Sequence, residues 1–195
     1  MIGIGVIGAG SMVARLAVLP AIVASTRATL AAASSLSTPP SSVWSDVSVA
    51  DYQAVLDHPD VDAVYIPLPN AMHEEWTIKA AAAGKHILCE KPIAASVQAA
   101  ERMRVACDNA GVLLAEAWMT PFDPRWAEVM RLAATGLVGA ITEVRSTFAF
   151  TIGPEASNNY RWDPAQGGGA LLDVGIYCLG PAVQLWGSKP SHIDA

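Results

Sequence analysis

The feature that most constrains the fold is an alternation of short apolar runs with helix-length segments over the first 120 residues. The clearest run, residues 61–68, is nearly continuous, which is typical of a strand buried on both faces. Because connections of a few residues separate these segments, we expect one parallel sheet wound on both faces by helices. The expected strands are residues 2–7, 29–33, 61–68, 85–89 and 112–119, and the expected helices are residues 11–24, 49–56, 72–83 and 94–110.

Composition narrows the class of protein. A hydrophobic fraction of 52% with 15% charged residues permits a packed core. The formal charge of −6 and the lack of a Lys/Arg cluster argue against a nucleic-acid surface, because phosphate contacts need concentrated positive charge. Three widely spaced cysteines predict a reducing compartment, the cytoplasm, without disulfides or a metal site. No apolar run reaches the ~18 residues that a membrane span needs.

A glycine turn, Gly8-Ala9-Gly10-Ser11-Met12, follows the first expected strand and precedes a helical pattern. In this context a G-x-G predicts a dinucleotide site. Gly8 permits the tight turn, and Gly10 lets the backbone approach a pyrophosphate at the helix N-terminus. Val13 occupies the third small position of the fingerprint, so an ordinary strand–turn–helix connection remains the alternative.

The end of the second expected strand predicts which dinucleotide is bound. Ser34 and Ser35 stand where an NAD-binding chain has an acidic residue for the ribose. A small hydroxyl leaves room for a 2′-phosphate and removes the repelling carboxylate. We therefore expect NADP in preference to NAD, although the arginine that usually accompanies the phosphate is absent.

Two polar stretches end strands on the edge where parallel sheets bind ligands. Glu90-Lys91-Pro92 ends the run that begins at His86, and Pro92 biases Lys91 towards an extended conformation at the rim. Pro69-Asn70 ends the preceding run in the same way. These positions predict the polar side of a ligand pocket.

The pattern changes after residue 120, which predicts a second domain over residues 121–195. We expect a helix at 125–135, a strand with period-two character at 140–150, a polar loop at 151–166 and a further strand beginning at 191–195. Three glycines open a helix expected at 170–186, on which Asp173 and Tyr177 are four residues apart and project from one face. The alternative is a surface pair on an amphipathic helix.

Three stretches carry a family resemblance: Tyr65-Ile-Pro-Leu-Pro-Asn70 with His73 and Trp76, Ala83-Gly-Lys-His-Ile-Leu-Cys-Glu-Lys-Pro92, and Gly167-Gly-Gly-Ala-Leu-Leu-Asp-Val-Gly-Ile-Tyr177. They resemble the Gfo/Idh/MocA family of NAD(P)-dependent oxidoreductases, and the resemblance covers essentially the whole chain. It is strongest to the branch with glucose–fructose oxidoreductase, NADP-dependent xylose dehydrogenase and dihydrodiol dehydrogenase. It implies a Rossmann domain at 1–120, followed at 121–195 by the incomplete start of an α+β domain with an antiparallel sheet.

The resemblance also implies residue roles. Lys91 would be the catalytic lysine, Asp173 would orient the substrate, and Tyr177 would act as acid and base. The pyrophosphate would be held by Gly8, Ala9, Gly10, Ser11 and Met12, and the adenosine ribose by Ser34. The nicotinamide side would be lined by Leu68, Asn70, His73, Glu90 and Lys91, with Arg161 and Trp162 closing over it.

Acid–base chemistry is consistent with these roles. Oxidising a carbinol removes a hydride and a proton, and a free tyrosine with a pKa of ~10 is a poor base near neutrality. A neighbouring ammonium such as Lys91 would favour the phenolate. The resemblance implies a dehydrogenase that acts on a sugar or cyclic polyol, and a homo-oligomer through the second-domain sheet if that sheet is complete.

Two other functions stay open: a dinucleotide-binding regulator or truncated fragment without activity, and an NAD-dependent glycosidase of the same fold. Intact Lys91, Asp173 and Tyr177 speak against the regulator, and Ser34 in place of an acid makes the glycosidase less favoured. The segment Met119-Thr120-Pro121-Phe122 lacks the Tyr-Arg that is usual in the most similar branch, which leaves the substrate open.

Overall fold

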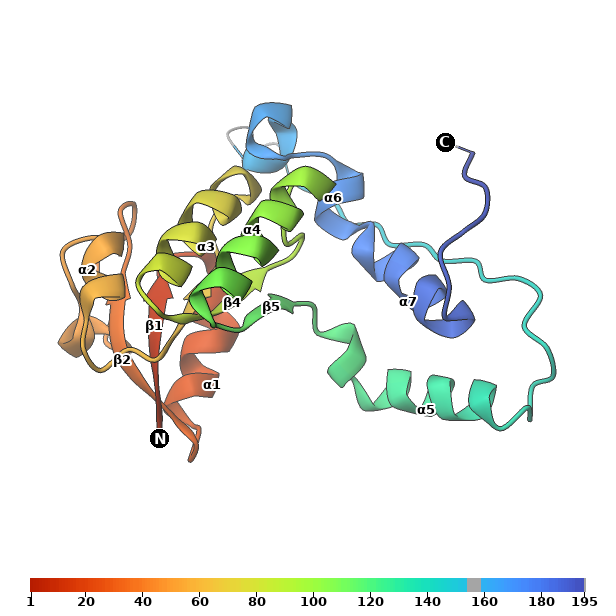
Figure 1. Cartoon of the computed structure of the whole chain (residues 1–195), viewed down its shortest axis with the longest axis horizontal. Helices are drawn as coiled ribbons and strands as arrows, with labels where there is room; N and C mark the ends of the chain where they lie inside the picture. Colours follow the sequence, from red (N-terminus) through yellow and green to blue (C-terminus); the bar gives the residue numbers. More distant parts are fainter. Residues whose placement is uncertain (154–158, 195) are drawn as a thin grey trace. The chain divides into compact units, whose positions relative to one another are not determined.

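A computed structural model describes residues 1–153 and 159–194 of the chain (Figure 1). The chain forms two compact units, Met1–Ala117 and Trp118–Ala195. The expected loop at 151–166 and the expected strand at 191–195 fall partly outside the described residues.

The first unit is built on one five-stranded sheet with the order β2-β1-β3-β4-β5. All four neighbouring pairs are parallel, which confirms the predicted sheet. From β1 the chain moves to β2 on one side, and from β3 to β5 it moves to the other side, so the strand order reverses between β1 and β3. Doubly wound sheets bind ligands at this position. The strands are β1 (Ile2–Ile7), β2 (Ala28–Ser34), β3 (Ala63–Ile66), β4 (His86–Glu90) and β5 (Leu114–Ala117).

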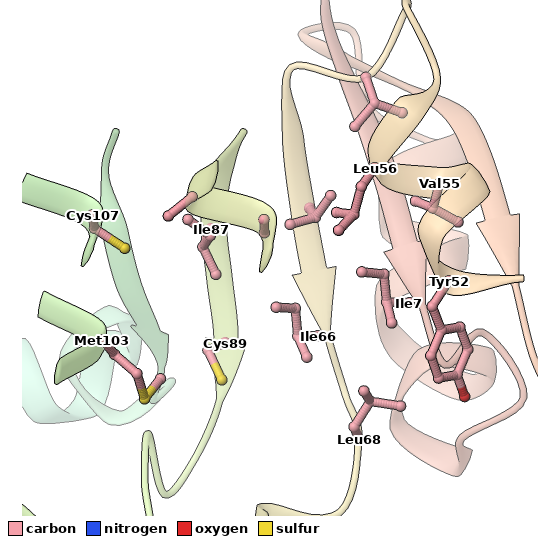
Figure 2. Close-up of a cluster of buried hydrophobic side chains, with 14 of the residues drawn as sticks. Ile7, Tyr52, Val55, Leu56, Ile66, Leu68, Ile87, Cys89, Met103 and Cys107 are labelled. Carbon is pink, nitrogen blue, oxygen red and sulfur yellow. The ribbon is translucent and has the colours of Figure 1, made fainter. Parts of the chain in front are cut away.

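Helices cover both faces of this sheet. The helices α2 (Tyr52–Asp57), α3 (His73–Ala82) and α4 (Val97–Ala110) share one face, where strand and helix side chains form the larger buried cluster (Figure 2). On the other face α1 (Leu19–Val23) packs with Val6 and Tyr65 of the strands. Alternate strand residues therefore face two different cores, as the near-continuous apolar runs predict.

The helix α2 begins later than expected. Its N-cap is Asp51, whose carboxylate accepts a hydrogen bond from the amide of Ala54 at 2.8 Å. The expected start at residue 49 was wrong, because Val49 donates its amide to the carbonyl of Ala33 at 3.0 Å. That bond keeps residues 48–49 in an extended conformation beside the end of β2.

The first helix also differs from the expected 11–24. A π-helical turn, Ala14–Val18, precedes α1, and Pro20 lies in the first turn of α1. Proline has no amide hydrogen to donate to the turn before it, which favours a widened turn at this point. The small residue that packs against the sheet is Ala14, which is fully buried, whereas Val13 is only half-buried.

The helices in the described part of the second unit are α5 (Pro124–Ala134), α6 (Ala170–Val174) and α7 (Ile176–Trp186). Short 3-10 turns lie at Thr120–Phe122, Tyr160–Trp162 and Pro164–Gln166, and the first unit has two more at Ser45–Val47 and Asn70–Met72. The expected single helix at 170–186 was wrong, because the chain bends at Gly175 between α6 and α7. Glycine is a weak helix former, so this is where the pattern breaks.

The expected strand at 140–150 was also wrong. Residues 140–153 carry no strand assignment, and neither do residues 191–194, so the predicted antiparallel sheet is absent from the described residues. A strand exists only by pairing with a neighbour, and no described segment of the second unit offers one.

No single helix in the described residues is long and apolar enough to cross a membrane. The helices Pro164–Val174 and Ile176–Trp186, which are bent by 52°, are long and apolar enough only when they are taken together, by length and composition alone.

Candidate active site

The glycine turn after β1 is bound to the end of β2 through the main chain. Gly8 has φ +98°, a conformation that favours glycine, and its amide and that of Ala9 both donate to the carbonyl of Ser34 at 2.9 Å. A methyl group on Gly8 would lie 2.8 Å from Cδ2 of Leu68 in the loop after β3. The turn therefore lies at the junction of three strand ends.

Gly10 lies against the segment that follows β2. A methyl group on Gly10 would lie 2.4 Å from Oγ of Ser35 and 2.5 Å from Cβ of Thr38. Ser35 accepts the amide of Thr38 at 3.1 Å, so the two residues form one small turn. Ser11 and Met12 follow at the start of the helical segment, with Met12 exposed. The lack of a side chain on Gly10 therefore lets the segment after β2 approach the glycine turn closely.

Ser34 is the last residue of β2, and its side chain is buried. It is 1% exposed, and its Oγ has no hydrogen-bond partner among the described residues. Its contribution to the turn is its carbonyl oxygen. Ser35, the next residue, is half-buried beside Gly10.

Glu90 and Lys91 end β4, and a buried tyrosine holds the glutamate. The phenol of Tyr65, which is 1% exposed, donates to Oε1 of Glu90 at 2.8 Å. Burial, and then the Glu90 carboxylate, raise the pKa of Tyr65, so the phenol stays a donor. The other carboxylate oxygen accepts the amide of Lys91 at 3.2 Å, and the Lys91–Pro92 peptide bond is cis.

His73 opens α3 and is fully buried. Its Nδ1 lies 2.9 Å from the carbonyl oxygen of Pro92, and its Nε2 lies 2.9 Å from that of Leu68. Burial lowers the pKa of His73, against the opposing effects of the two carbonyls and Glu90. A side chain without exposed surface acts on a cofactor only through the loops that it joins. Asn70, between these loops, is 3% exposed.

Glu116 of β5 contacts the segment that follows Pro92. No role for this residue was predicted from the sequence. Its Oε1 accepts the amide of Ile93 at 2.8 Å. Partial burial raises the pKa of Glu116, with Glu90 adding to the rise and Lys91 opposing it. A carboxylate inside an otherwise apolar strand was the signal that could have identified it.

In the second unit Asp173 is 5% exposed, which excludes the surface-pair alternative. Its Oδ2 accepts Nε of Arg161 at 2.6 Å. Gly168 permits this arrangement, because a methyl group there would lie 2.6 Å from the carbonyl oxygens of Tyr160 and Arg161. The glycine triplet thus brings the chain against the turn that carries Arg161. Trp162 in that turn is 59% exposed.

Tyr177 lies on α7, beyond the bend, and not on the same helix as Asp173. Its ring stacks on Phe148 with centroids 5.1 Å apart and planes at 21°. It also lines a hollow with Phe122, Arg125 and Trp126. Phe148 had no predicted role, because it belongs to the segment that was expected to be a strand.

The described residues therefore form two groups. The first unit brings together the glycine turn, Ser34, Leu68, Asn70 and His73 with Glu90 and Lys91 at the carboxyl ends of its strands. The second unit brings Arg161 to Asp173 and places Tyr177 on the following helix. No group of three or more potential metal ligands occurs in residues 1–153 and 159–194.

Known protein families match both units. An NAD-binding Rossmann-fold model of the Gfo/Idh/MocA oxidoreductases matches residues 2–117, and the C-terminal domain model of these proteins matches residues 126–195. The chain belongs to the Gfo/Idh/MocA oxidoreductase family.

Named members of the Gfo/Idh/MocA family are similar over most of the chain. The D-xylose 1-dehydrogenase (NADP(+)) 2 of Haloferax volcanii is 37% identical over 182 residues, which cover 91% of this chain and 55% of that protein. Among solved structures, the aldose-aldose oxidoreductase of Caulobacter crescentus complexed with glycerol superposes with a TM-score of 0.85 at 33% identity, covering 97% and 58% of the two chains.

A 3-ketoreductase of Actinomadura kijaniata, solved in complex with NADP and TDP-benzene, gives a TM-score of 0.81 at 35% identity, covering 95% of this chain and 57% of that one. The chain spans about half the length of the curated relatives it matches.

Proposed function

We propose that this Gfo/Idh/MocA chain is part of an NADP-dependent oxidoreductase that transfers a hydride between the cofactor and a hydroxyl-bearing carbon of a sugar or cyclic polyol. The observation that carries this proposal is the position of Lys91. It directly follows β4 at the edge of the sheet where the glycine turn follows β1. The names of the relatives, which include an NADP-dependent xylose dehydrogenase and an NADP-bound ketoreductase, support the same chemistry.

The bound nicotinamide would supply the hydride acceptor or donor. The chain's own side chains would handle the proton and the hydroxyl groups. Tyr177 exchanges the proton of the reacting hydroxyl, Lys91 stabilises the charge that develops on that oxygen, and Asp173 accepts a hydrogen bond from a neighbouring hydroxyl. The Arg161 ion pair fixes the Asp173 carboxylate in one orientation.

A lysine variant tests this proposal. Lys91→Met keeps most of the side-chain volume and removes the charge, so we expect cofactor binding within about threefold of the original and a loss of kcat of ~10²–10⁴-fold. Turnover of a panel of sugars and polyols, followed by the fluorescence of reduced nicotinamide, measures kcat. Unchanged turnover in this variant would exclude the assigned role of Lys91.

NADP preference is tested separately by titrating the chain with NADPH and NADH. No acidic residue ends β2, so nothing repels a 2′-phosphate, and we expect NADPH to bind more tightly. Tighter binding of NADH would overturn the preference. Tight binding without turnover of any panel member would favour the regulator over the enzyme.

The oligomeric state and compartment belong to the same proposal. The second unit exposes large apolar side chains, including Phe122 at 85% and Leu137 at 75%, which supports association through this unit. Light scattering across a concentration series tests for a homo-oligomer. The three free cysteines are consistent with work in the cytoplasm, where thiols stay reduced.

A further inference from the structure

We propose that Tyr65, His73 and Glu116 are positioning residues that fix the turn carrying Lys91 from both faces of the sheet. The inference rests on the proposed function, in which Lys91 touches the substrate. None of the three belongs to the glycine turn or to the second unit, and none is assigned to catalysis.

The register of the strands explains how two faces take part. Tyr65 lies opposite Leu88 on the neighbouring strand, so it shares a face with Glu90, two residues further along. Glu116 lies opposite Cys89, whose side chain points to the other face. The turn that leaves β4 is therefore held by Tyr65 on the α1 face and by Glu116 on the face that carries α3 and α4.

Each contact binds a different atom of a short turn. Tyr65 holds the Glu90 carboxylate at 2.8 Å, His73 lies 2.9 Å from the Pro92 carbonyl, and Glu116 holds the Ile93 amide at 2.8 Å. These atoms flank Lys91 on both sides along the chain. Contacts at the Glu90 carboxylate, the Pro92 carbonyl and the Ile93 amide restrict the backbone of Lys91 between them.

Partly buried hydrogen bonds of this kind hold the backbone in one conformation. Any conformation that breaks such a bond leaves a desolvated polar group without a partner, which costs free energy. Tyr65 and His73 are 1% and 0% exposed, so water cannot replace them without local opening. Misplacing a reacting group by about 1 Å can cost ~10²-fold in rate. Loosening the turn should therefore lower kcat and leave cofactor binding nearly unchanged.

Paired variants test the proposal. Tyr65→Phe removes only the phenol oxygen, Glu116→Ala removes the acceptor, and Glu116→Gln removes the charge but keeps an acceptor oxygen for Ile93. We expect kcat to fall by ~10-fold or more in Tyr65→Phe and Glu116→Ala, with the KM for NADP within about threefold, and to recover largely in Glu116→Gln. Tyr52→Phe is the matched control, since Tyr52 is a buried tyrosine that packs on Trp76, away from the turn.

Amide hydrogen exchange gives a readout that needs neither cofactor nor turnover. The Ile93 amide should exchange ~10-fold faster in Glu116→Ala and at the original rate in Glu116→Gln, because only the first variant loses the acceptor. Equal exchange in all three chains would overturn the proposal, and so would kcat values within twofold of the original in both Tyr65→Phe and Glu116→Ala. If Lys91→Met keeps its turnover, the proposed function fails, while the exchange rates still decide whether the turn is held.

Discussion

His73 is a buried histidine that joins two loops of the first unit. His73 sits between two carbonyl oxygens, and a neutral imidazole has one hydrogen to offer them. Burial lowers its pKa despite these acceptors and the Glu90 carboxylate. At neutral pH the tautomer therefore selects which of the two loops, at Leu68 or at Pro92, receives the hydrogen bond.

Acid should destabilise the first unit through His73. Because its folded pKa lies below the unfolded value of ~6.5, the unfolded chain binds the proton more tightly, and stability falls as pH drops through that value. We expect up to about 1.4 kcal/mol to be lost between pH 7.5 and 5.5 from this group. Urea unfolding at several pH values measures the loss.

The matched variants for this measurement are His73→Gln and His192→Gln. The first should flatten the dependence between pH 7.5 and 5.5, and the second, at an exposed histidine, should leave it unchanged. An equal slope in His73→Gln and the original chain would assign the acid sensitivity to other groups.

The buried ion pair of the second unit gives another prediction at this scale. Arg161→Gln leaves the Asp173 carboxylate buried without its cation, and we expect a loss of about 2 kcal/mol, less than for a fully buried pair because Arg161 is 26% exposed. Adding Asp173→Asn should recover part of this loss, because the unpaired charge is then removed. A double-mutant cycle in urea measures the coupling, and strictly additive losses would show that the pair does not interact.

Among elements, α2 shows how a local signal can point to the wrong residue. Ser48 and Asp51 fit a capping box in sequence, but residues 48–49 pair with the end of β2. Asp51→Ala should cost about 1 kcal/mol, whereas Ser48→Ala should cost only a few tenths. Thermal unfolding of the two variants ranks their stabilities, and a larger loss in Ser48→Ala would contradict Asp51 as the cap.

The sequence predicted the elements whose pattern is local. Five strands and their helices follow from apolar periodicity, and the positions of Gly8 and Lys91 follow from the strand ends. The Tyr65–Glu90 contact depends on the register between strands 25 residues apart in the chain, which no local pattern encodes. The segment 140–150 has the period of a strand but no partner, and period alone does not make a sheet.

At the scale of the molecule, the two units differ in how much apolar surface they bury. The buried hydrophobic side chains of the described residues all lie between Val6 and Cys107, while the second unit exposes Phe122, Leu137 and Leu171. Stability follows buried apolar area, so the first unit should be the more resistant to opening.

Limited proteolysis with trypsin tests this difference. We expect cleavage first after Arg125, Arg131 or Arg145, and a protected fragment that contains residues 1–117. Mass spectrometry of the early fragments identifies the sites. Early cleavage at Arg102 or Arg104 within α4 would contradict the expected order.

The binding of the glycine turn to Ser34 has a consequence for protein engineering. The carbonyl oxygen of Ser34, and not its hydroxyl, accepts the hydrogen bonds from the amides of Gly8 and Ala9. The conformation of the turn therefore does not depend on that hydroxyl. A carboxylate introduced at Ser34 to switch the coenzyme would be buried and would cost stability. Ser35 is half-buried beside Gly10 and follows the last residue of β2, so we expect a carboxylate there to cost less stability than one at Ser34.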